Sequence, residues 1–536
     1  EIFRISKVHI TDFNFRLNNF MESQRPPQQM GINYEDLDVM LENLSAKKLK
    51  FSGGVMSGIA EQIKVSEKSG YKATISGSCK AGMGKVLIDD LKIKDEWSDL
   101  DLRFLNMTFR NGLAFADFLN KVKIEARFRP SRVAITTVAY TGSAQLFGNE
   151  GIYDIQRGHV LGPVSDMQIE KFVFSEQKSG MSGRIDVRLR GLPDVMDFRI
   201  DGRVRDISFG TAGLSFFINS WSQGSKLDFS RFAPSTRFEL NATTSGLLNN
   251  LKVNGLLSSN AGSLNIAGSL DDLIDKSRAL KIVANASTSP SIDMGIILGS
   301  EALGEMDFST GARLLLVPGR PTIIVDSLMV ERVRMKDYEY KGLSASARLV
   351  NNNLWARLES KDSNLVMKAL ANVDLKTHNG IAEYKLGMDV SRINTDTLGF
   401  THTGFNTGMS FGLDLNVSSD DSLYLKGYAD INNPTLFSDE GEYRPGAIQI
   451  NADNDGKLQN LNIESDIFTL SLSSDKNILA IVPDFLNSSA RRELNAICPE
   501  LEHPETPGNH KVELNFLNTG EITEVFFPGL YIEKGT

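Results

Sequence analysis

The sequence predicts an all-β fold with minor α content, in which an elongated, curled antiparallel sheet forms a hydrophobic groove. The first observation is that apolar and polar residues alternate with a period of two, which is typical of half-buried strands. Ile185, Val187 and Leu189, for example, alternate with charged residues. The same pattern recurs along the chain at Phe198, Ile200, Val204, Leu251, Val253, Leu257, Leu423, Leu425, Ile448, Ile450, Leu461, Ile463, Leu470, Leu472, Val512, Leu514 and Phe516.

The second observation is that the segments between these runs are short and rich in turn residues. Asn111-Gly112 and Asn379-Gly380 each suit a tight hairpin, because Asn and Gly tolerate a positive φ. Apolar runs recur about every 10–15 residues, which predicts about 30–40 strands. Such links are too short for crossover helices, so neighbouring strands are expected to be antiparallel.

Helices are expected to be few and to cap the edges of the sheet. The strongest prediction is residues 484–496, where Leu486, Ala490 and Leu494 share one helical face and Pro483 and Pro499 mark the ends. Weaker helical patterns cover 113–120 and 212–222. We divide the chain into a first part of the β-groove (1–225), a second part (226–480) and a helix with further strands (481–536), which caps the groove or begins its next segment.

Length and composition exclude several classes of protein. A chain of 536 residues is too long for one compact core, because single cores rarely exceed about 250–300 residues. The net charge of −9 disfavours a nucleic-acid partner. Two cysteines, Cys79 and Cys498, do not make a disulfide framework. No run of 18 apolar residues is present. Because the chain starts with Glu1, we expect a processed product or a piece of a longer protein.

Motifs for catalysis are near misses. Gly84-Lys85 lacks the first glycine and the hydroxyl residue of a phosphate-binding loop, and a hairpin is the better interpretation. Asn451, Asp453 and Asp455 resemble the start of a calcium loop, but position twelve is Asn462 rather than a bidentate carboxylate. The sequence therefore predicts no enzyme, no cofactor and no catalytic or metal site.

Paired carboxylates and histidines lead to the same conclusion. The pairs Asp89-Asp90, Asp271-Asp272 and Asp420-Asp421 could serve a glycosidase, but each lies where a turn or strand end is expected. His503 and His510 are near each other in the sequence without further ligands at metal-site spacing.

Several segments, in this order, resemble one family. These are 3–15 (FRISKVHITDFNF), 70–93, 111–128, 190–199 (RGLPDVMDFR), 335–342, 360–370 and 447–473. The chain is similar to the Bacteroidetes branch of the TamB proteins, in the AsmA-like superfamily of bridge-like lipid transfer proteins. The likeness covers the middle portion of those longer proteins, without their N-terminal membrane anchor.

This resemblance implies a β-taco, a repeating β-groove with an apolar interior that crosses the periplasm. It implies tethering to the inner membrane, a BamA-like outer-membrane barrel as partner, and two roles: phospholipid transport between the membranes and assistance to outer-membrane protein assembly. The expected ligands are phospholipid acyl chains.

The candidates for the apolar floor of the groove all come from the alternating apolar set. They are Val187, Leu189, Val253, Leu257, Leu425, Ile450, Leu470 and Leu472. Two alternatives to a lipid conduit stay open. One is a structural or adhesive extracytoplasmic β-protein with a dry core between two facing sheets, and the other is a β-helical carbohydrate-active enzyme.

Overall fold

A computed structural model of the chain separates into two compact units. The first comprises residues 1–300 and 314–320, and the second comprises residues 301–313 and 321–536. The structure describes residues 2–18, 31–33, 36–111, 114, 117–141, 151–192, 194, 196–221, 232–272, 280–317, 322–375, 380–400, 406–420, 425–439, 441–454, 458–475 and 509–520.

The first unit is a meander of antiparallel strands. Each of β1 to β6 pairs with the next strand along the chain, β7 and β8 both lie between β6 and β9, and consecutive pairing resumes from β9 to β16. Its strands are β1 (Ile2–Asn18), β2 (Asp36–Ser52), β3 (Val55–Glu67), β4 (Lys72–Gly82), β5 (Lys85–Asp95), β6 (Asp99–Thr108), β7 (Lys123–Phe128), β8 (Ser131–Ala134), β9 (Ile152–Gly162), β10 (Asp166–Glu176), β11 (Ser182–Arg190), β12 (Arg199–Gly210), β13 (Arg237–Leu247), β14 (Asn250–Ser259), β15 (Gly262–Asp271) and β16 (Leu280–Asp293).

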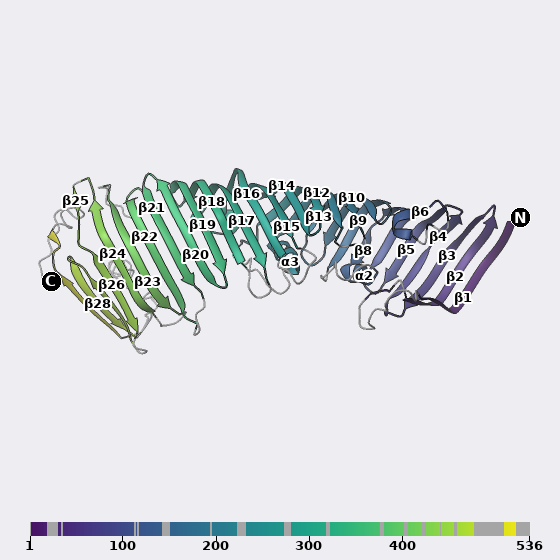
Figure 1. Ribbon diagram of the computed structural model, residues 1–536, viewed down its shortest axis with the longest axis horizontal. Helices are drawn as coiled ribbons and strands as arrows, with labels where there is room; N and C mark the ends of the chain where they lie inside the picture. Colours follow the sequence, from purple (N-terminus) through teal and green to yellow (C-terminus); the bar gives the residue numbers. More distant parts are fainter. Residues whose placement is uncertain are drawn as a thin grey trace, which may run out of the picture. The chain divides into compact units, whose positions relative to one another are not determined.

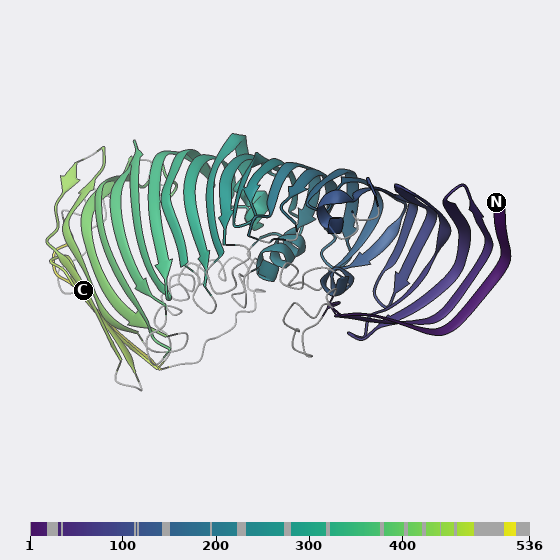
Figure 2. The same cartoon turned by 45° about the vertical axis from the view of Figure 1, so that its right-hand side comes forward.

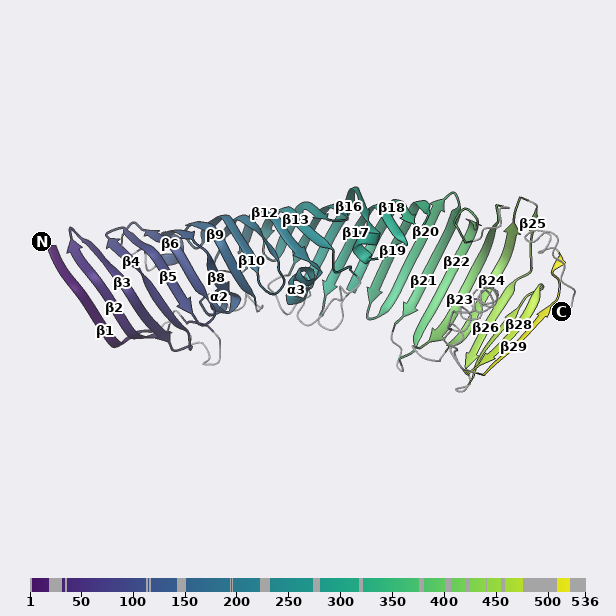
Figure 3. The same cartoon turned by 180° about the vertical axis from the view of Figure 1, so that it is seen from behind.

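The second unit continues the same pattern. Figures 1 and 3, which view the molecule from opposite sides, show β19 to β24 side by side in chain order. β17 (Leu303–Leu316) has residues in both units. The remaining strands are β18 (Thr322–Met335), β19 (Tyr338–Val350), β20 (Asn353–Asp362), β21 (Leu365–Asp374), β22 (Ala382–Asn394), β23 (Gly408–Ser419), β24 (Leu425–Phe437), β25 (Glu442–Tyr443), β26 (Ile448–Asn454), β27 (Gln459–Glu464), β28 (Phe468–Ser474) and β29 (His510–Phe516).

Bulges bend the long strands. Lys171 and Asp206 have φ of 49° and 52°, and the pairing register shifts at both positions. A side chain of the adjacent strand satisfies each bulged amide: Asp186 Oδ1 accepts from Lys171 N at 2.7 Å, and Asn241 Oδ1 accepts from Asp206 N at 3.0 Å. A bulge bends its strand and increases the local twist, and Figure 2 shows the strands of each unit bent along their length.

Four short helices interrupt the strands among the described residues: α1 (Phe118–Lys121), α2 (Ile135–Thr141), α3 (Thr211–Trp221) and α4 (Met294–Leu298). The prediction at 212–222 is confirmed by α3. Within the prediction at 113–120, the described residues 114 and 117 are 3₁₀-helical and 118–120 belong to α1, so the described part of this segment is helical as predicted. Residues 484–496 lie outside the described residues.

α2 and α4 were not predicted. α4 has a clear local cause, because the Asp293 side chain accepts from Gly295 N and Ile296 N at its start and Gly299 adopts φ 65° at its end. α2 instead depends on contacts with the β5–β6 turn: Tyr140 stacks on Trp97 with ring centroids 5.1 Å apart, and Thr137 Oγ1 donates to Asp95 Oδ2 at 2.7 Å.

The predicted fold class is confirmed. The described residues form one antiparallel sheet of 29 strands, with few and short helices. The compact units divide the chain near residue 300, whereas the sequence divisions fall after 225 and 480. The division after residue 225 falls between β12 and β13, which pair with each other from Arg199 to Gly210 and belong to the same compact unit. The second division lies outside the described residues.

Candidate functional site

Four of the eight predicted groove residues lie in the first unit, and the strand register puts all four on one face of its sheet. Directly paired residues in neighbouring antiparallel strands share a face. Val187 is joined to Val253 by a row of such pairs that passes through β12 and β13. Leu189 and Leu257 lie two and four residues further along the same two strands, and side chains alternate between faces, so both share this face.

This face, which we call the apolar face, has a floor of small and aliphatic side chains. Gly202 lies in the row that joins Val187 to Val253, Gly268 continues this row onto β15, and Gly255 pairs with Ala242. A Cβ added at any of the three glycines would meet a backbone oxygen of the neighbouring strand at 2.2–2.3 Å, so glycine permits the close approach of strands here. The same rows on β11 to β16 also contain Ile185, Ile200, Val204, Leu240, Leu251, Leu264, Ile266, Leu270, Ile282, Ala284 and Ala286.

The other four predicted residues share one face in the second unit. Ile450 pairs with Ile463, which pairs with Leu470, and Leu472 lies two residues further along β28. Ile450 also pairs with Ala429, and Leu425 precedes Ala429 by four residues on β24. The register therefore places each set of four on a single face of its own unit.

Burial on the apolar face comes from the sheet itself. Leu91, Leu102 and Ala126 are 4%, 5% and 6% exposed, and their packing partners are apolar residues of β4 to β9 on the same face. No second sheet covers them, since all strands of the described residues belong to one sheet. Residues of a single layer shield one another in this way when the layer is curled toward them.

The absence of a second layer also bears on the dry-core alternative, which requires two facing sheets. The described strands provide only one sheet. In the second unit, Val390, Leu425 and Leu472 are similarly buried on the apolar face at 3%, 7% and 6% exposure.

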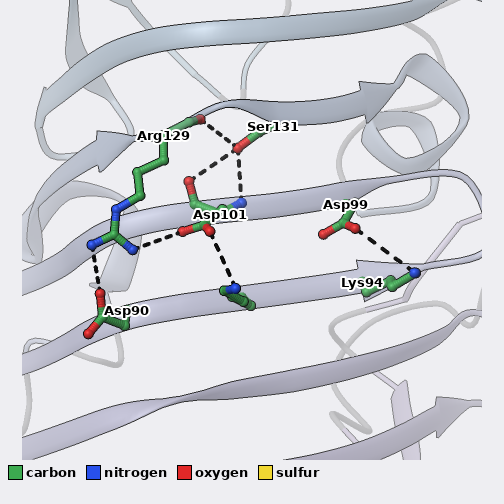
Figure 4. Close-up of polar contacts among 7 residues, drawn as sticks. Asp90, Lys94, Asp99, Asp101, Arg129 and Ser131 are labelled. Atoms are coloured by element: carbon green, nitrogen blue, oxygen red, sulfur yellow. Dashed lines mark hydrogen bonds and ion pairs between the residues drawn. The ribbon is translucent and has the colours of Figure 1, made fainter.

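The opposite face, which we call the polar face, is covered with charged side chains in salt bridges. Figure 4 shows one such group on β5 to β8. The Arg129 guanidinium donates to Asp90 at 2.7 Å and to Asp101 at 3.3 Å, and Lys92 lies 3.7 Å from Asp101. The Ser131 hydroxyl accepts from Asp101 N at 2.9 Å, which fixes β8 against β6.

Arginines lower the pKa of two carboxylates on the polar face, Asp166 and Asp326. The hydrogen bond from Arg188, with Nε at 2.6 Å from Oδ1, holds the pKa of Asp166 below its usual value. The hydrogen bond from Arg313, at 2.8 Å, does the same for the pKa of Asp326. A lowered pKa at Asp166 and Asp326 is the opposite of what a general acid requires at neutral pH.

Members of the carboxylate pairs considered in the sequence lie at bulges or turns or bind neighbouring side chains. Asp90 and Asp272 are bulge or turn residues with φ of 54° and 62°. Asp90 binds Arg129, and Asp271 accepts from Asn250 Nδ2 at 2.7 Å. Asp420 is described, but Asp421 is not. In the described part of the chain, no group of three His, Cys, Asp or Glu side chains is arranged to hold a metal ion.

The remaining motif residues lie in hairpins or outside the described residues. Gly84 and Lys85 are at the β4–β5 hairpin turn, as expected. Asn451 and Asp453 lie within β26, and residues 455–457 are not described. Cys79 is a free, half-buried thiol whose pKa is raised by burial, and Cys498 lies outside the described residues. No helix among the described residues is long and apolar enough to cross a membrane.

Sequence reasoning missed one feature, a hollow on the polar face of β18 to β24. Its lining includes Trp355, Tyr428, Leu370 and Gly387. The available signal was an aromatic residue at a position where the alternation requires a polar one, in β20 and again in β24.

No family model, no curated protein and no solved structure matches this chain.

Proposed function

We propose that this chain carries phospholipid acyl chains along the apolar face of its curled sheet. The observation that supports the proposal is the register. All eight alternating apolar residues chosen from the sequence lie, within each unit, on one face that no second sheet covers among the described strands.

The energetics of such a face suit a mobile lipid. Each methylene group removed from water contributes about 0.8 kcal/mol, so an acyl chain gains from lying on Val253, Leu257 and their neighbours. Adjacent rows on β11 to β16 present similar aliphatic and small side chains. A ligand that finds nearly equal sites on successive strands can move between them with low barriers and without a catalytic group.

The resemblance to the TamB family extends the proposal to the setting. On this resemblance we propose that the chain lies in the periplasm, tethered to the inner membrane in the full-length protein, with a BamA-like barrel as the outer-membrane partner. Assistance to outer-membrane protein assembly is proposed on the same resemblance alone.

Site-specific photo-crosslinking tests which face meets lipid. A benzophenone side chain is introduced at Val253 or Leu470 on the apolar face, and at the neighbouring residues Asn254 or Ser471 on the polar face. After irradiation with vesicles of bacterial phospholipid, we expect lipid adducts in the mass spectrum at Val253 and Leu470 only. Equal labelling of both faces, or no labelling at Val253 and Leu470, would contradict the proposal.

A further inference from the structure

The polar face of the second unit contains a hollow of about 840 Å³ on β18 to β24. By strand alternation, side chains that enter it are on the face opposite to Ile450 and Leu425, because Tyr428 and Asp430 flank Ala429, the partner of Ile450. The hollow is therefore separate from the proposed lipid surface, and the two lie on opposite sides of the same strands.

Three large apolar side chains are exposed in this hollow. Trp355 on β20 is 44% exposed, Leu370 on β21 is 61% exposed, and Tyr428 on β24 is 43% exposed. Leaving these surfaces in water is unfavourable, and an exposed apolar group rimmed by polar residues is a common mark of a binding site. Ordinary positions on this face hold charged or amide side chains, so folding of the sheet does not account for the two aromatic rings.

The polar lining has balanced charge. Three cations and three anions border the hollow: Arg348, Arg357, Lys385, Asp326, Asp414 and Asp430. Asn372 and Asn416 add amide donors and acceptors. Within the described residues Lys385 and Asp430 have no ion-pair or side-chain hydrogen-bond partner, so their hydrogen-bonding groups are available to a ligand.

Gly387 forms the floor of the hollow. It pairs with Leu370 on one side and Asp414 on the other. A Cβ added at Gly387 would meet only Asp414 Oδ1, at 3.8 Å, and the glycine does not have a positive φ. The backbone does not require glycine here, and the missing side chain is what leaves the space open.

We propose that this hollow binds a linear oligosaccharide, with sugar rings stacked on Trp355 and Tyr428 and hydroxyl groups hydrogen-bonded to the charged and amide side chains. A pyranose ring with equatorial hydroxyls has apolar C–H faces that match aromatic rings and a polar rim that matches carboxylates, amides and guanidinium groups. Trp355 and Tyr428 lie four strands apart, on the order of 19 Å at about 4.8 Å per strand, so several linked rings would span the site.

Other ligand classes fit this lining less well. A nucleic acid or an anionic lipid headgroup requires an excess of cations, whereas the charges here balance. A peptide that adds a strand requires a free strand edge, whereas each of β20 to β24 is paired on both sides. A neutral polyhydroxylated chain satisfies both the aromatic and the polar groups.

Titration with defined oligosaccharides tests the proposal. The purified chain is titrated with β-1,4-linked hexamers of glucose and of N-acetylglucosamine, followed by calorimetry and tryptophan fluorescence. We expect saturable binding of at least one hexamer. Trp355→Ala removes a stacking surface, and Gly387→Val fills the floor, so each should weaken binding about tenfold or more.

Two controls separate this site from the lipid surface and from misfolding. Tyr384→Ala removes an exposed aromatic ring from the opposite face of β22 and should leave hexamer affinity unchanged. Gly387→Val should leave lipid crosslinking at Val253 unchanged and should not lower the melting temperature. Lack of saturable binding of both hexamers, or binding that neither Trp355→Ala nor Gly387→Val weakens, would overturn the proposal. Binding of RNA or unstructured peptides in place of the hexamers, weakened by the same two variants, would also overturn it.

Discussion

Two carboxylates placed on the apolar face of β14 should obstruct lipid passage, whereas the same change on the polar face should not. The test variant is Leu251→Asp with Val253→Asp, and the matched control is Asn254→Asp with Leu256→Asp. Both variants add two negative charges, two residues apart, to one strand. The charges fall on opposite faces in the two variants, because side chains alternate along β14.

The expected size of the effect follows from burial. Fully burying a Leu or Val side chain contributes about 1.5–3 kcal/mol. Leu251 and Val253 are each half-buried in the sheet, so about half of that value remains to be gained against an acyl chain. For both residues together the loss is about 1.5–3 kcal/mol, or about a tenfold to hundredfold weaker site at this strand.

Fluorescent phospholipid provides the assay. Equilibrium binding and transfer between donor and acceptor vesicles are measured for the wild type, the test variant and the control, and thermal melting confirms that all three fold. The test variant should lose binding and transfer within the stated range, and the control should match the wild type. If the folded test variant transfers lipid as fast as the control, the apolar face of β14 is not on the lipid path.

Three further outcomes follow from the structure. Leu91→Ala should lower the free energy of unfolding by about 2–4 kcal/mol in denaturant titration, because Leu91 is buried at 4% exposure, whereas Leu256→Ala on the polar face should change it by under about 0.5 kcal/mol. Because the pKa of Asp166 is lowered, its bond with Arg188 stabilises the fold fully at pH values above the ordinary pKa of 3.8, and this stabilisation is lost as the pH falls through the folded-state pKa. The difference in melting temperature between the wild type and Asp166→Asn should therefore shrink below pH 3.8. A difference that stays constant with pH would contradict this. Because burial raises the pKa of the Cys79 thiol, iodoacetamide should alkylate it more slowly in the native than in the urea-unfolded protein at mildly alkaline pH, as measured by peptide mass spectrometry; equal rates would show that the thiol is exposed.

Local sequence was sufficient to predict the strands that make most of their contacts with their neighbours in the chain. The runs at 185–189 and 251–257 are strands β11 and β14, because antiparallel strands joined by short links pair with their chain neighbours and each needs only its own alternation. The run at 512–516 is β29, which pairs with β28 although the connection from Ser474 to His510 is long. α3 begins at Thr211, directly after β12 ends. Its helical pattern was also visible in the local sequence.

Sequence reasoning failed where distant residues decide the local structure. Ile135, Thr136 and Thr137 are β-branched and favour a strand, yet they begin α2. Contacts with the β5–β6 turn, including the 2.7 Å bond from Thr137 to Asp95 and the stacking of Tyr140 on Trp97, override that preference.

The periodicity of the chain alone determined that the strands would have one apolar and one polar side, and it selected the residues that belong to the apolar side. It could not determine that these sides align from strand to strand, because a shift of one residue in any pairing would invert a strand without changing its alternation. The bulges at Lys171 and Asp206, the burial of Leu91 within a single layer, and the space over Gly387 between the rings of Trp355 and Tyr428 exist only after pairing. Such features depend on which strands become neighbours and in what register, and only the tertiary structure decides both.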